Sequence, residues 1–307
     1  MNKCVGCGVS TENNLCERCF RIRNYNEYKK IEVDDKKFLN NLDKIHDDDL
    51  VVLVVDLLNI PENLDAIKNK INNKVVLVIN KFDLSPTNNE ERYKKYFDRY
   101  DLNVIDTICI STKNNYNLDY LYDLIKKSSS NKVYFIGYTN SGKSSLINKL
   151  IYNYSSNDTV ITTSYLANTT LDLISIKLDD FTLIDTPGIV VHNSINKIND
   201  NILKKLSKSK RIKPISYQVK NSQYIFIEDL VKITLSNNDI IIYVPSNIEV
   251  NRFYKDKYFN GVKTIDYNIT STTDIVIPNI GFIKVKSGLV KIEVNSDIDI
   301  FTREPLI

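Results

Sequence analysis

Gly137-Tyr138-Thr139-Asn140-Ser141-Gly142-Lys143-Ser144 is the stretch of this 307-residue chain that decides its fold. It matches the phosphate-binding pattern G-x-x-x-x-G-K-[ST] and stands between a predicted strand, Val133–Gly137, and a predicted helix, Ser144–Tyr152. In this pattern the glycines let backbone N–H groups approach phosphate oxygens, the lysine meets the β and γ oxygens, and the serine hydroxyl binds Mg²⁺. The sequence therefore predicts a phosphate site at Gly137, Asn140, Ser141, Gly142, Lys143, Ser144 and Ser145.

A second phosphate motif, Asp185-Thr-Pro-Gly188, ends the predicted strand Phe181–Asp185. Asp185 can hold Mg²⁺ through water, and the Gly188 N–H can sense a γ-phosphate. Thr169 and Thr170 lie between the two motifs, and one of them, with Thr170 preferred, is expected to close on Mg²⁺ when a triphosphate is bound. The candidate catalytic residues are Lys143, Thr170, Asp185 and Gly188.

The tetrapeptide Asn80-Lys81-Phe82-Asp83 follows the predicted strand Val75–Ile79 and indicates which base is bound. A carboxylate at Asp83 can accept the N1–H and N2 amino protons of guanine, whereas adenine would leave a buried charge unpaired. We expect Asn80 to hold the loops around the base and the Lys81 stem to cover its face. Backbone N–H groups for guanine O6 are expected at the end of the next strand, from Ser111, Thr112 and Lys113. The predicted ligands are GTP and GDP.

The guanine motifs at 80–113 precede the phosphate motifs at 137–188, whereas in Ras-like GTPases the phosphate loop comes first. This order predicts a circularly permuted Ras-like P-loop domain. Such a permutation is tolerated because the ends of a compact domain lie close together, and the polar run Lys126–Lys132 is the natural linker between the former ends.

The hydrophobic pattern predicts an α/β domain followed by a β-rich domain. Up to Asp185, short Val- and Ile-rich runs alternate with helical patterns, which favours a parallel sheet with helices on both faces. From about Pro214 the runs become closely spaced strands, and no internal repeat is evident. The Lys-rich segment Asn193–Arg211 is predicted to be helical. The expected domains are a knuckle at 1–30, a GTPase domain at 31–210 and a β-rich domain at 211–307.

Four of the five cysteines form two C-x-x-C pairs near the N-terminus: Cys4, Cys7, Cys16 and Cys19. Each short turn can present two thiolates to one ion, so the spacing predicts a structural zinc knuckle. Disulfide bonds are the competing interpretation, and a reducing cytosol disfavours them. No apolar signal stretch follows a basic start, and we expect a cytoplasmic protein with no membrane span.

Composition is that of an ordinary globular protein, with 42% apolar and 26% charged residues, which excludes a collagen or a disordered chain. The net charge of +3 is unevenly spread. Residues 31–200 carry 19 Lys and Arg against 24 Asp and Glu, whereas residues 201–307 carry 16 against 11. Basic flanks around an acidic middle suit a nucleic-acid binder, although an excess of this size is also found on ordinary solvated surfaces.

Taken together, these motifs resemble the YqeH-like circularly permuted GTPases that assist assembly of the small ribosomal subunit. The resemblance covers essentially the whole chain and includes Cys16-Glu-Arg-Cys19, the Thr-Thr-Leu-Asp run at 169–172 and the ending Thr302-Arg-Glu-Pro-Leu-Ile. It implies binding to the 30S subunit or its precursor and to 16S rRNA. Two features depart from the family: the segment between the cysteine pairs is short, and Ala167-Asn168 replaces the usual Pro-Gly before the threonines.

The residue after Gly188 is Ile189, where Ras-like enzymes place a water-orienting glutamine, so intrinsic hydrolysis is expected to be slow. Asn140 occupies the phosphate-loop position that resembles potassium-dependent GTPases, and the alternative role for it is hydrogen bonding within the loop. An alternative function is a GTP-switched regulator that acts on a protein partner without binding RNA.

Overall fold

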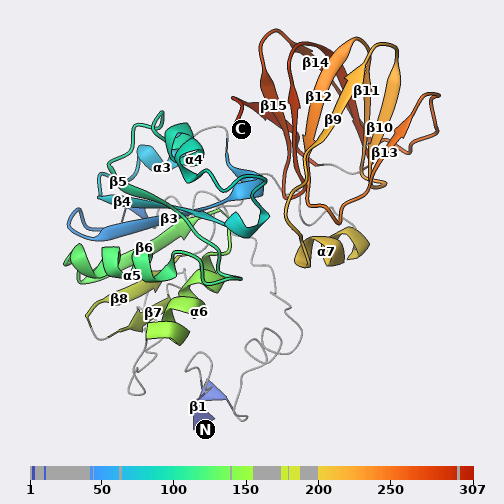
Figure 1. The fold of residues 1–307 in the computed structure, drawn as a ribbon. Helices are drawn as coiled ribbons and strands as arrows, with labels where there is room; N and C mark the ends of the chain where they lie inside the picture. Colours follow the sequence, from blue (N-terminus) through green and yellow to red (C-terminus); the bar gives the residue numbers. More distant parts are fainter. Residues whose placement is uncertain are drawn as a thin grey trace. The chain divides into compact units, whose positions relative to one another are not determined.

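The computed structural model describes residues 2–3, 10–11, 42–43, 45–61, 64–138, 140–154, 174–178, 180–186, 200–295 and 298–307. The chain divides into two compact units (Figure 1). The α/β unit comprises Met1–Val55, Asp65–Asn80 and Asp101–Val190. The β-rich unit comprises Asp56–Leu64, Lys81–Tyr100 and Val191–Ile307, so two short segments from the first hundred residues belong with the C-terminal strands.

The α/β unit is built on a six-stranded sheet of order β5-β4-β3-β6-β8-β7. Its strands are β3 (Leu50–Asp56), β4 (Val75–Asn80), β5 (Val104–Cys109), β6 (Lys132–Gly137), β7 (Ile174–Lys177) and β8 (Thr182–Asp185). The pairs β3–β6, β4–β5 and β6–β8 are parallel, but β7 pairs antiparallel with β8. The sheet is therefore mixed and not purely parallel as predicted, because a short connection between consecutive strands can only join them antiparallel.

Helices α5 (Leu118–Lys127) and α6 (Lys143–Tyr154) cover one face of this sheet. One hydrophobic cluster joins Leu121 of α5 and Leu146 of α6 to strand residues such as Val52 and Phe135, all of them fully buried. Strand β3 is buried along its whole length, which explains why it reads as a continuous apolar run. The predicted helix Ser144–Tyr152 is thus present as α6, and the predicted strands Val75–Ile79 and Val133–Gly137 are present as β4 and β6.

The β-rich unit is a sandwich of two five-stranded antiparallel sheets, in the orders β13-β10-β11-β17-β14 and β18-β15-β16-β12-β9. Its strands are β9 (Ile215–Val219), β10 (Gln223–Ile227), β11 (Val231–Leu235), β12 (Asn238–Tyr243), β13 (Val250–Phe253), β14 (Lys263–Ile269), β15 (Thr273–Ile277), β16 (Gly281–Val285), β17 (Gly288–Val294) and β18 (Phe301–Arg303). Alternate residues of both sheets, such as Ile225 and Ile233 on one and Ile275 and Ile283 on the other, fill a shared core.

This sandwich is an internal duplication, which the sequence did not reveal. Equivalent strands begin at residues 223 and 273, at 231 and 281, and at 238 and 288, a constant offset of 50 residues. The register repeats as well: Ile225 pairs with Ile233, and Ile275 pairs with Ile283. Replacing each strand of β9–β13 by its counterpart in β14–β18 converts the order of one sheet into that of the other. The two halves are therefore related by a pseudo-twofold axis.

Short helices complete the β-rich unit. They are η1 (Leu57–Asn59), η2 (Phe82–Leu84), α4 (Glu90–Phe97) and α7 (Asp200–Ser207). Helix α7 confirms part of the helix predicted over Asn193–Arg211, and its Ile202 is buried in the sandwich core. The α/β unit also contains α3 (Asp65–Lys68) and the small pair β1 (Asn2–Lys3) and β2 (Ser10–Thr11). In the part of the chain that the structure describes, no helix has the length and apolar character to cross a membrane.

Candidate nucleotide-binding site

The predicted phosphate loop connects β6 to α6, as its pattern requires. Its two glycines hold positions that other residues would not fit. Gly137 has φ +153°, and a Cβ there would lie 2.3 Å from the Val54 carbonyl oxygen. Gly142 has φ +87°, and its Cβ would lie 2.2 Å from Asn80 Nδ2. Backbone conformation and close packing therefore both demand glycine at these positions.

Lys143, Ser144 and Asp185 meet at one place in the α/β unit. The Lys143 ammonium donates a hydrogen bond to Asp185 Oδ1, and the Ser144 hydroxyl lies 3.4 Å from Asp185 Oδ2. Lys143 is 7% exposed, so the pair is largely shielded from water. Hydroxyl and carboxylate oxygens are ligands that Mg²⁺ prefers, directly or through water, so this donor set fits Mg²⁺.

Asn80 links the guanine motif to the phosphate loop. It is the last residue of β4 and is 1% exposed, and its Nδ2 donates a 2.9 Å hydrogen bond to the Ser141 carbonyl oxygen. On the other side of the loop, Thr186 Oγ1 donates to the Phe135 carbonyl oxygen at 2.8 Å, which ties the end of β8 to β6. The structure thus brings the ends of β4, β6 and β8 together around the loop. Asn140 lies on this loop with an exposed side chain and a φ of +65°, and Ser145 is exposed on α6.

Lys81 and Asp83 belong to the β-rich unit, whereas Asn80 belongs to the α/β unit, so the unit boundary falls within the motif. Lys81 Nζ lies 2.6 Å from Asp56 Oδ2, and Asp56 Oδ1 accepts the Leu58 N–H at 2.9 Å. Asp83 is half-buried within η2. Asp56 belongs to none of the sequence motifs. The available signal was an acidic residue ending an otherwise apolar strand, the position at which sheets of this class bind ligands.

The loop after β5 carries the residues predicted to contact guanine O6. The Ser111 N–H donates to the Tyr116 carbonyl oxygen at 3.2 Å, and the Tyr116 N–H donates back to Ser111 at 3.0 Å. This pair of bonds closes a tight loop and uses the Ser111 donor. Thr112 and Lys113, the other two residues predicted to offer N–H groups to guanine O6, lie within this loop.

Several predicted site residues lie outside the described residues. These are Thr169, Thr170 and Gly188 of the switch motifs and Cys4, Cys7, Cys16 and Cys19 of the predicted knuckle. Within the described residues, no group of three or more His, Cys, Asp and Glu side chains is arranged to hold a metal.

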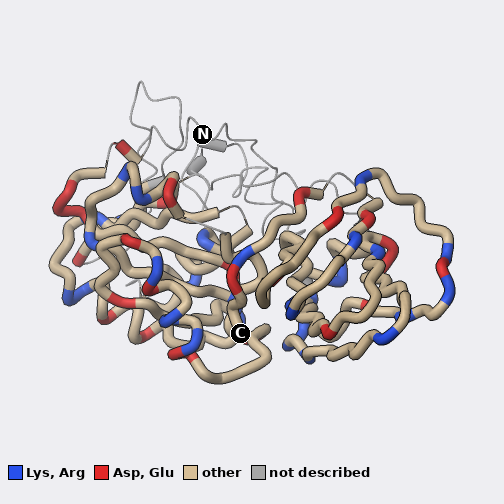
Figure 2. The backbone as a smooth tube through the Cα atoms, turned by 90° about the horizontal axis from the view of Figure 1, so that it is seen from above, with Lys and Arg blue, Asp and Glu red and all other residues tan. Residues whose placement is uncertain are grey.

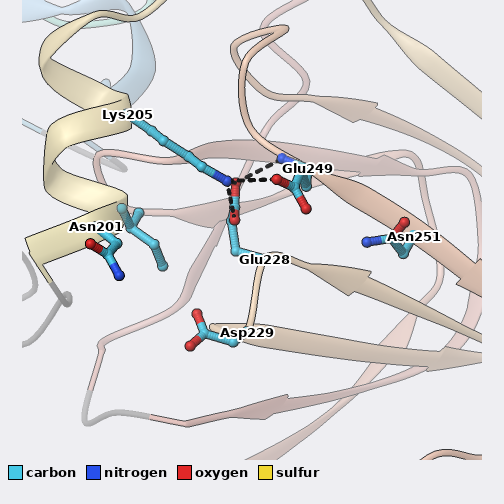
Figure 3. Close-up of a pocket in the computed structure, with 7 residues that line it drawn as sticks. Asn201, Lys205, Glu228, Asp229, Glu249 and Asn251 are labelled. Carbon is cyan, nitrogen blue, oxygen red and sulfur yellow. Dashed lines mark hydrogen bonds and ion pairs between the residues drawn. The ribbon is translucent and has the colours of Figure 1, made fainter.

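A cavity of about 600 Å³ lies in the β-rich unit, where α7 faces the ends of β10 and β13 (Figure 3). Its polar lining carries three carboxylates, Glu228, Asp229 and Glu249, against one amine, Lys205. Lys205 Nζ lies 2.8 Å from Glu228 Oε2 and from Glu249 Oε1, and these hydrogen bonds raise the pKa of Lys205. Because its lining is net acidic, this cavity does not suit phosphate. Its ion pairs instead fix α7 to the sandwich.

The phosphate loop, the Lys143–Asp185 pair and the Asn80 bridge define the α/β unit as a P-loop GTPase domain. A family described as 50S ribosome-binding GTPase matches residues 132–247. The chain is also 32% identical, over 281 residues, to the uncharacterized protein YqeH of Bacillus subtilis, and the match covers 81% of this chain and 77% of that protein. The chain belongs to the YqeH family.

The chain is also similar to proteins named GTPase Der over about half of its length. GTPase Der of Mycoplasma mycoides is 31% identical over 177 residues, and GTPase Der of Limosilactobacillus reuteri is 28% identical over 183 residues. Each match covers 52% of this chain and 40% of the Der protein.

Proposed function

We propose that this GTPase assists assembly of the 30S ribosomal subunit in the cytoplasm through nucleotide-controlled binding to 16S rRNA or to pre-ribosomal particles. The contact between Asn80 and the phosphate loop carries the nucleotide part of the proposal, since it joins the guanine motif to the phosphate motif. The basic excess of residues 201–307 supports an RNA partner. Basic and acidic residues are interspersed along the chain trace (Figure 2), so this excess is not one continuous basic stretch.

We further propose that the GTPase domain, within residues 31–210, is circularly permuted. The strands that lead into the guanine motifs, β4 and β5, come before β6 and its phosphate loop in the chain. In the sheet, β4 and β5 lie on one side of β3, and β6 and β8 lie on the other. A Ras-like domain would give this arrangement if its original ends, the last helix and the first strand, were joined through the α5–β6 connection and the chain were opened between the strand of the Asp185–Gly188 motif and the strand that follows it in Ras-like order.

The bound groups are GTP or GDP with Mg²⁺, held by Lys143, Ser144 and Asp185 and, in this proposal, by Thr170 and the Gly188 N–H. Mg²⁺ would supply positive charge to the β and γ oxygens. Phosphate oxygens compete with Asp185 for the Lys143 ammonium, and the lysine then stabilises charge that develops on them. No glutamine follows Gly188, and Ile189 cannot orient water, so we expect slow intrinsic hydrolysis.

Two further ions belong to the proposal. Zinc would be held by Cys4, Cys7, Cys16 and Cys19 of a knuckle at 1–30, and metal analysis of the full chain should find one zinc, which a Cys16→Ser variant loses. Potassium would lie beside Asn140 and add positive charge at the phosphates. Turnover in K⁺ should then exceed turnover in Na⁺ for the wild type, and an Asn140→Ala variant should be slow in both salts.

Co-sedimentation with purified ribosomal particles tests the function. The full chain is mixed with 30S precursors, mature 30S subunits or 50S subunits, with GDP or with a non-hydrolysable GTP analogue, at one fixed salt concentration. We expect nucleotide-dependent binding to 30S particles, lost in Lys143→Ala. Binding to 50S subunits alone would agree with the description of the matched family and overturn the 30S assignment. Binding to no ribosomal particle would favour the alternative, a GTP-switched regulator with a protein partner and no RNA.

A further inference from the structure

The internal duplication gives the sandwich two equivalent outer sheet faces. On the sheet of β15 and β16 this face is buried: Val276 and Phe282 are at most 1% exposed, and Tyr243 stacks on Phe282 with the ring centroids 4.6 Å apart. Arg303 lies over the Phe282 ring, and its Nη1 donates to the Ile60 carbonyl oxygen at 2.9 Å. The segment after β3 therefore covers this face within the β-rich unit.

The equivalent face of the other sheet is crossed by a loop. Strands β13 and β14 form its opposite edges, so residues 254–262, here called the crossing loop, run from one edge to the other. Ile225 and Ile227 of β10 point into the core, which places Tyr224 and Phe226 on the outer face. Three contacts attach the crossing loop to the sheet: the Phe259 ring on Phe226 (5.7 Å), Asp256 with Lys232 (2.8 Å) and the Val262 N–H with the Val294 carbonyl oxygen (2.7 Å).

Apolar side chains of the crossing loop point in two directions. Phe259 packs inward, but Tyr254, Tyr258 and Val262 are 71%, 90% and 68% exposed. They account for three of the eight large exposed apolar side chains found among the described residues, within nine consecutive positions. Scattered exposed rings are common on proteins, whereas such a cluster marks an interaction site. None of the three contacts that attach the crossing loop involves Tyr254 or Tyr258, so both exposed rings can contact a partner.

Positive charge alternates with these rings. Lys255 and Lys257 flank Asp256, whose carboxylate is already paired with Lys232. Lys257 Nζ lies 3.6 Å from the centroid of the Phe253 ring. Arg252 is not part of this outer surface. It lies opposite Ile225 in the pairing of β13 with β10 and so shares its face, with its Nε held by Gln223 Oε1 at 2.5 Å and its guanidinium 5.1 Å from the Tyr217 ring of the other sheet. The crossing loop therefore presents two cations, Lys255 and Lys257, and no unpaired carboxylate of its own.

Rings that alternate with cations match an unpaired nucleic-acid strand, because bases stack on the rings while phosphates meet the amines. A duplex does not offer its base faces, since they are stacked on one another. The centre of a protein interface is usually depleted of lysine, which disfavours a protein partner here. The observations therefore favour single-stranded RNA.

We propose that the crossing loop binds single-stranded RNA, with Tyr254 and Tyr258 each stacking on one unpaired base and Lys255 and Lys257 contacting phosphates. This inference rests on the proposed ribosomal function and names the contact surface for it. The duplication places the surface: one of the two equivalent faces is covered by the segment after β3, and the other carries the crossing loop, whose exposed side is the proposed RNA contact.

The test measures fluorescence anisotropy of a labelled single-stranded 12-nucleotide RNA, a duplex of the same sequence and the matching single-stranded DNA, with the full chain. Tyr254→Ala and Tyr258→Ala should each weaken single-strand binding about 10-fold, and Tyr→Phe at either position should restore it, because stacking needs the ring and not the hydroxyl. The matched control is Tyr152→Ala in α6, which removes a ring that is 83% exposed and has a lysine, Lys149, 5.9 Å from its centroid.

A second set of variants tests the cations. Replacing both Lys255 and Lys257 by Gln should reduce the slope of log affinity against log salt by about 1.4, since each phosphate contact on a single strand contributes about 0.7. The inference is wrong if Tyr254→Ala and Tyr258→Ala bind the single strand as tightly as Tyr152→Ala, or if the duplex binds as tightly as the single strand.

Co-sedimentation of the same variants separates the two proposals. If the wild type binds 30S particles in a nucleotide-dependent manner and the tyrosine variants are unaffected, the crossing-loop inference fails and the proposed function stands. Loss of particle binding in the tyrosine variants without RNA binding by the wild type would assign the surface to a ribosomal protein and overturn the RNA inference. Failure of the wild type to bind any particle would remove the proposed function itself.

Discussion

Gly142 and Asn80 constrain each other, although they lie 62 positions apart in the chain. A Cβ on Gly142 would lie 2.2 Å from Asn80 Nδ2, the atom that donates to Ser141, and the Gly142 φ of +87° disfavours any side chain. Gly142→Ala should therefore break the Asn80 bridge and reduce the affinity for GTP and GDP together, by at least about 100-fold. Titration with a fluorescent guanine nucleotide measures this loss.

Gly261→Ala is the matched control, because a Cβ there meets its nearest neighbours at 3.4 Å, an ordinary contact. It should bind nucleotide like the wild type. Unchanged affinity in Gly142→Ala would show that the contact between Asn80 and the phosphate loop does not support the site.

Asp83 is the residue to which we assign base selection. Asp83→Asn replaces an acceptor by a group that can donate, so GTP affinity should fall at least about 100-fold, and xanthosine triphosphate, whose O2 replaces the amino group, should bind better than GTP. Competition between the two nucleotides in wild type and variant measures the reversal. GTP affinity equal to that of the wild type would disprove the assignment.

At the scale of residues, the sequence predicts those that belong to a local pattern. Lys143, Ser144 and Asp185 belong to motifs with fixed spacing from a glycine or a strand end, and the structure brings their side chains together. The Asp56–Lys81 pair was not found, because its partners are 25 positions apart and each has other plausible roles. The use of the Ser111 N–H within its own loop depends on backbone conformation, which single residue types do not determine.

At the scale of elements, strand β18 is held by a buried ion pair. Arg303 and Asp274 have side chains that are 0% exposed, with Arg303 Nε 3.6 Å from Asp274 Oδ2, and burial raises the pKa of Asp274 and lowers that of Arg303. Asp274→Ala would leave a buried guanidinium unpaired, and it should reduce the free energy of unfolding by about 3 to 5 kcal/mol. Urea unfolding of the full chain measures this change.

The double variant Asp274→Leu with Arg303→Met should regain most of the lost stability, because it removes both buried charges. Asp101→Asn, which breaks the exposed pair with Lys68, is the control and should leave unfolding nearly unchanged. Additive losses in the double variant would contradict the interpretation of Arg303 and Asp274 as a coupled pair.

Elements were predictable to the extent that burial imposes a pattern. Strand β4 is buried along its whole length and reads as an apolar run, and its predicted end, Ile79, lies one residue from its observed end, Asn80. Strand β7 has four residues and β13 is partly exposed along its length, so neither carries a clear signal. The duplication was missed because a sandwich core requires only alternating apolar residues, which many unrelated side chains satisfy.

At the scale of the whole molecule, the phosphate motif at Asp185–Gly188 belongs to the α/β unit, and the chain then enters the β-rich unit, which includes everything from Val191 onward. Helix α7 belongs firmly to the β-rich unit, because Ile202 is buried in its core and Lys205 pairs with Glu228 and Glu249. A flexible insertion intended to separate the two units must therefore precede Asp200.

We expect a six-residue Gly-Ser insertion between Asn199 and Asp200 to abolish the difference in 30S affinity between GDP and a GTP analogue, while leaving nucleotide affinity unchanged. The control is the same insertion between Ser236 and Asn237, at the turn that joins β11 to β12 within the β-rich unit. Affinity at fixed salt, by co-sedimentation, is the measurement. An unchanged nucleotide effect in the first insertion would show that coupling does not pass through this part of the chain.

The attachment of the crossing loop to its sheet has a consequence for the time course of RNA capture. Because Phe259, Asp256 and Val262 already fix the loop, little backbone entropy is lost when a strand arrives, and no ordering step delays the encounter. Lysine and tyrosine should then govern separate rate constants. Loss of Lys255 and Lys257 should slow association, since long-range attraction acts before contact. Loss of Tyr254 or Tyr258 should speed dissociation, since stacking exists only in the bound state.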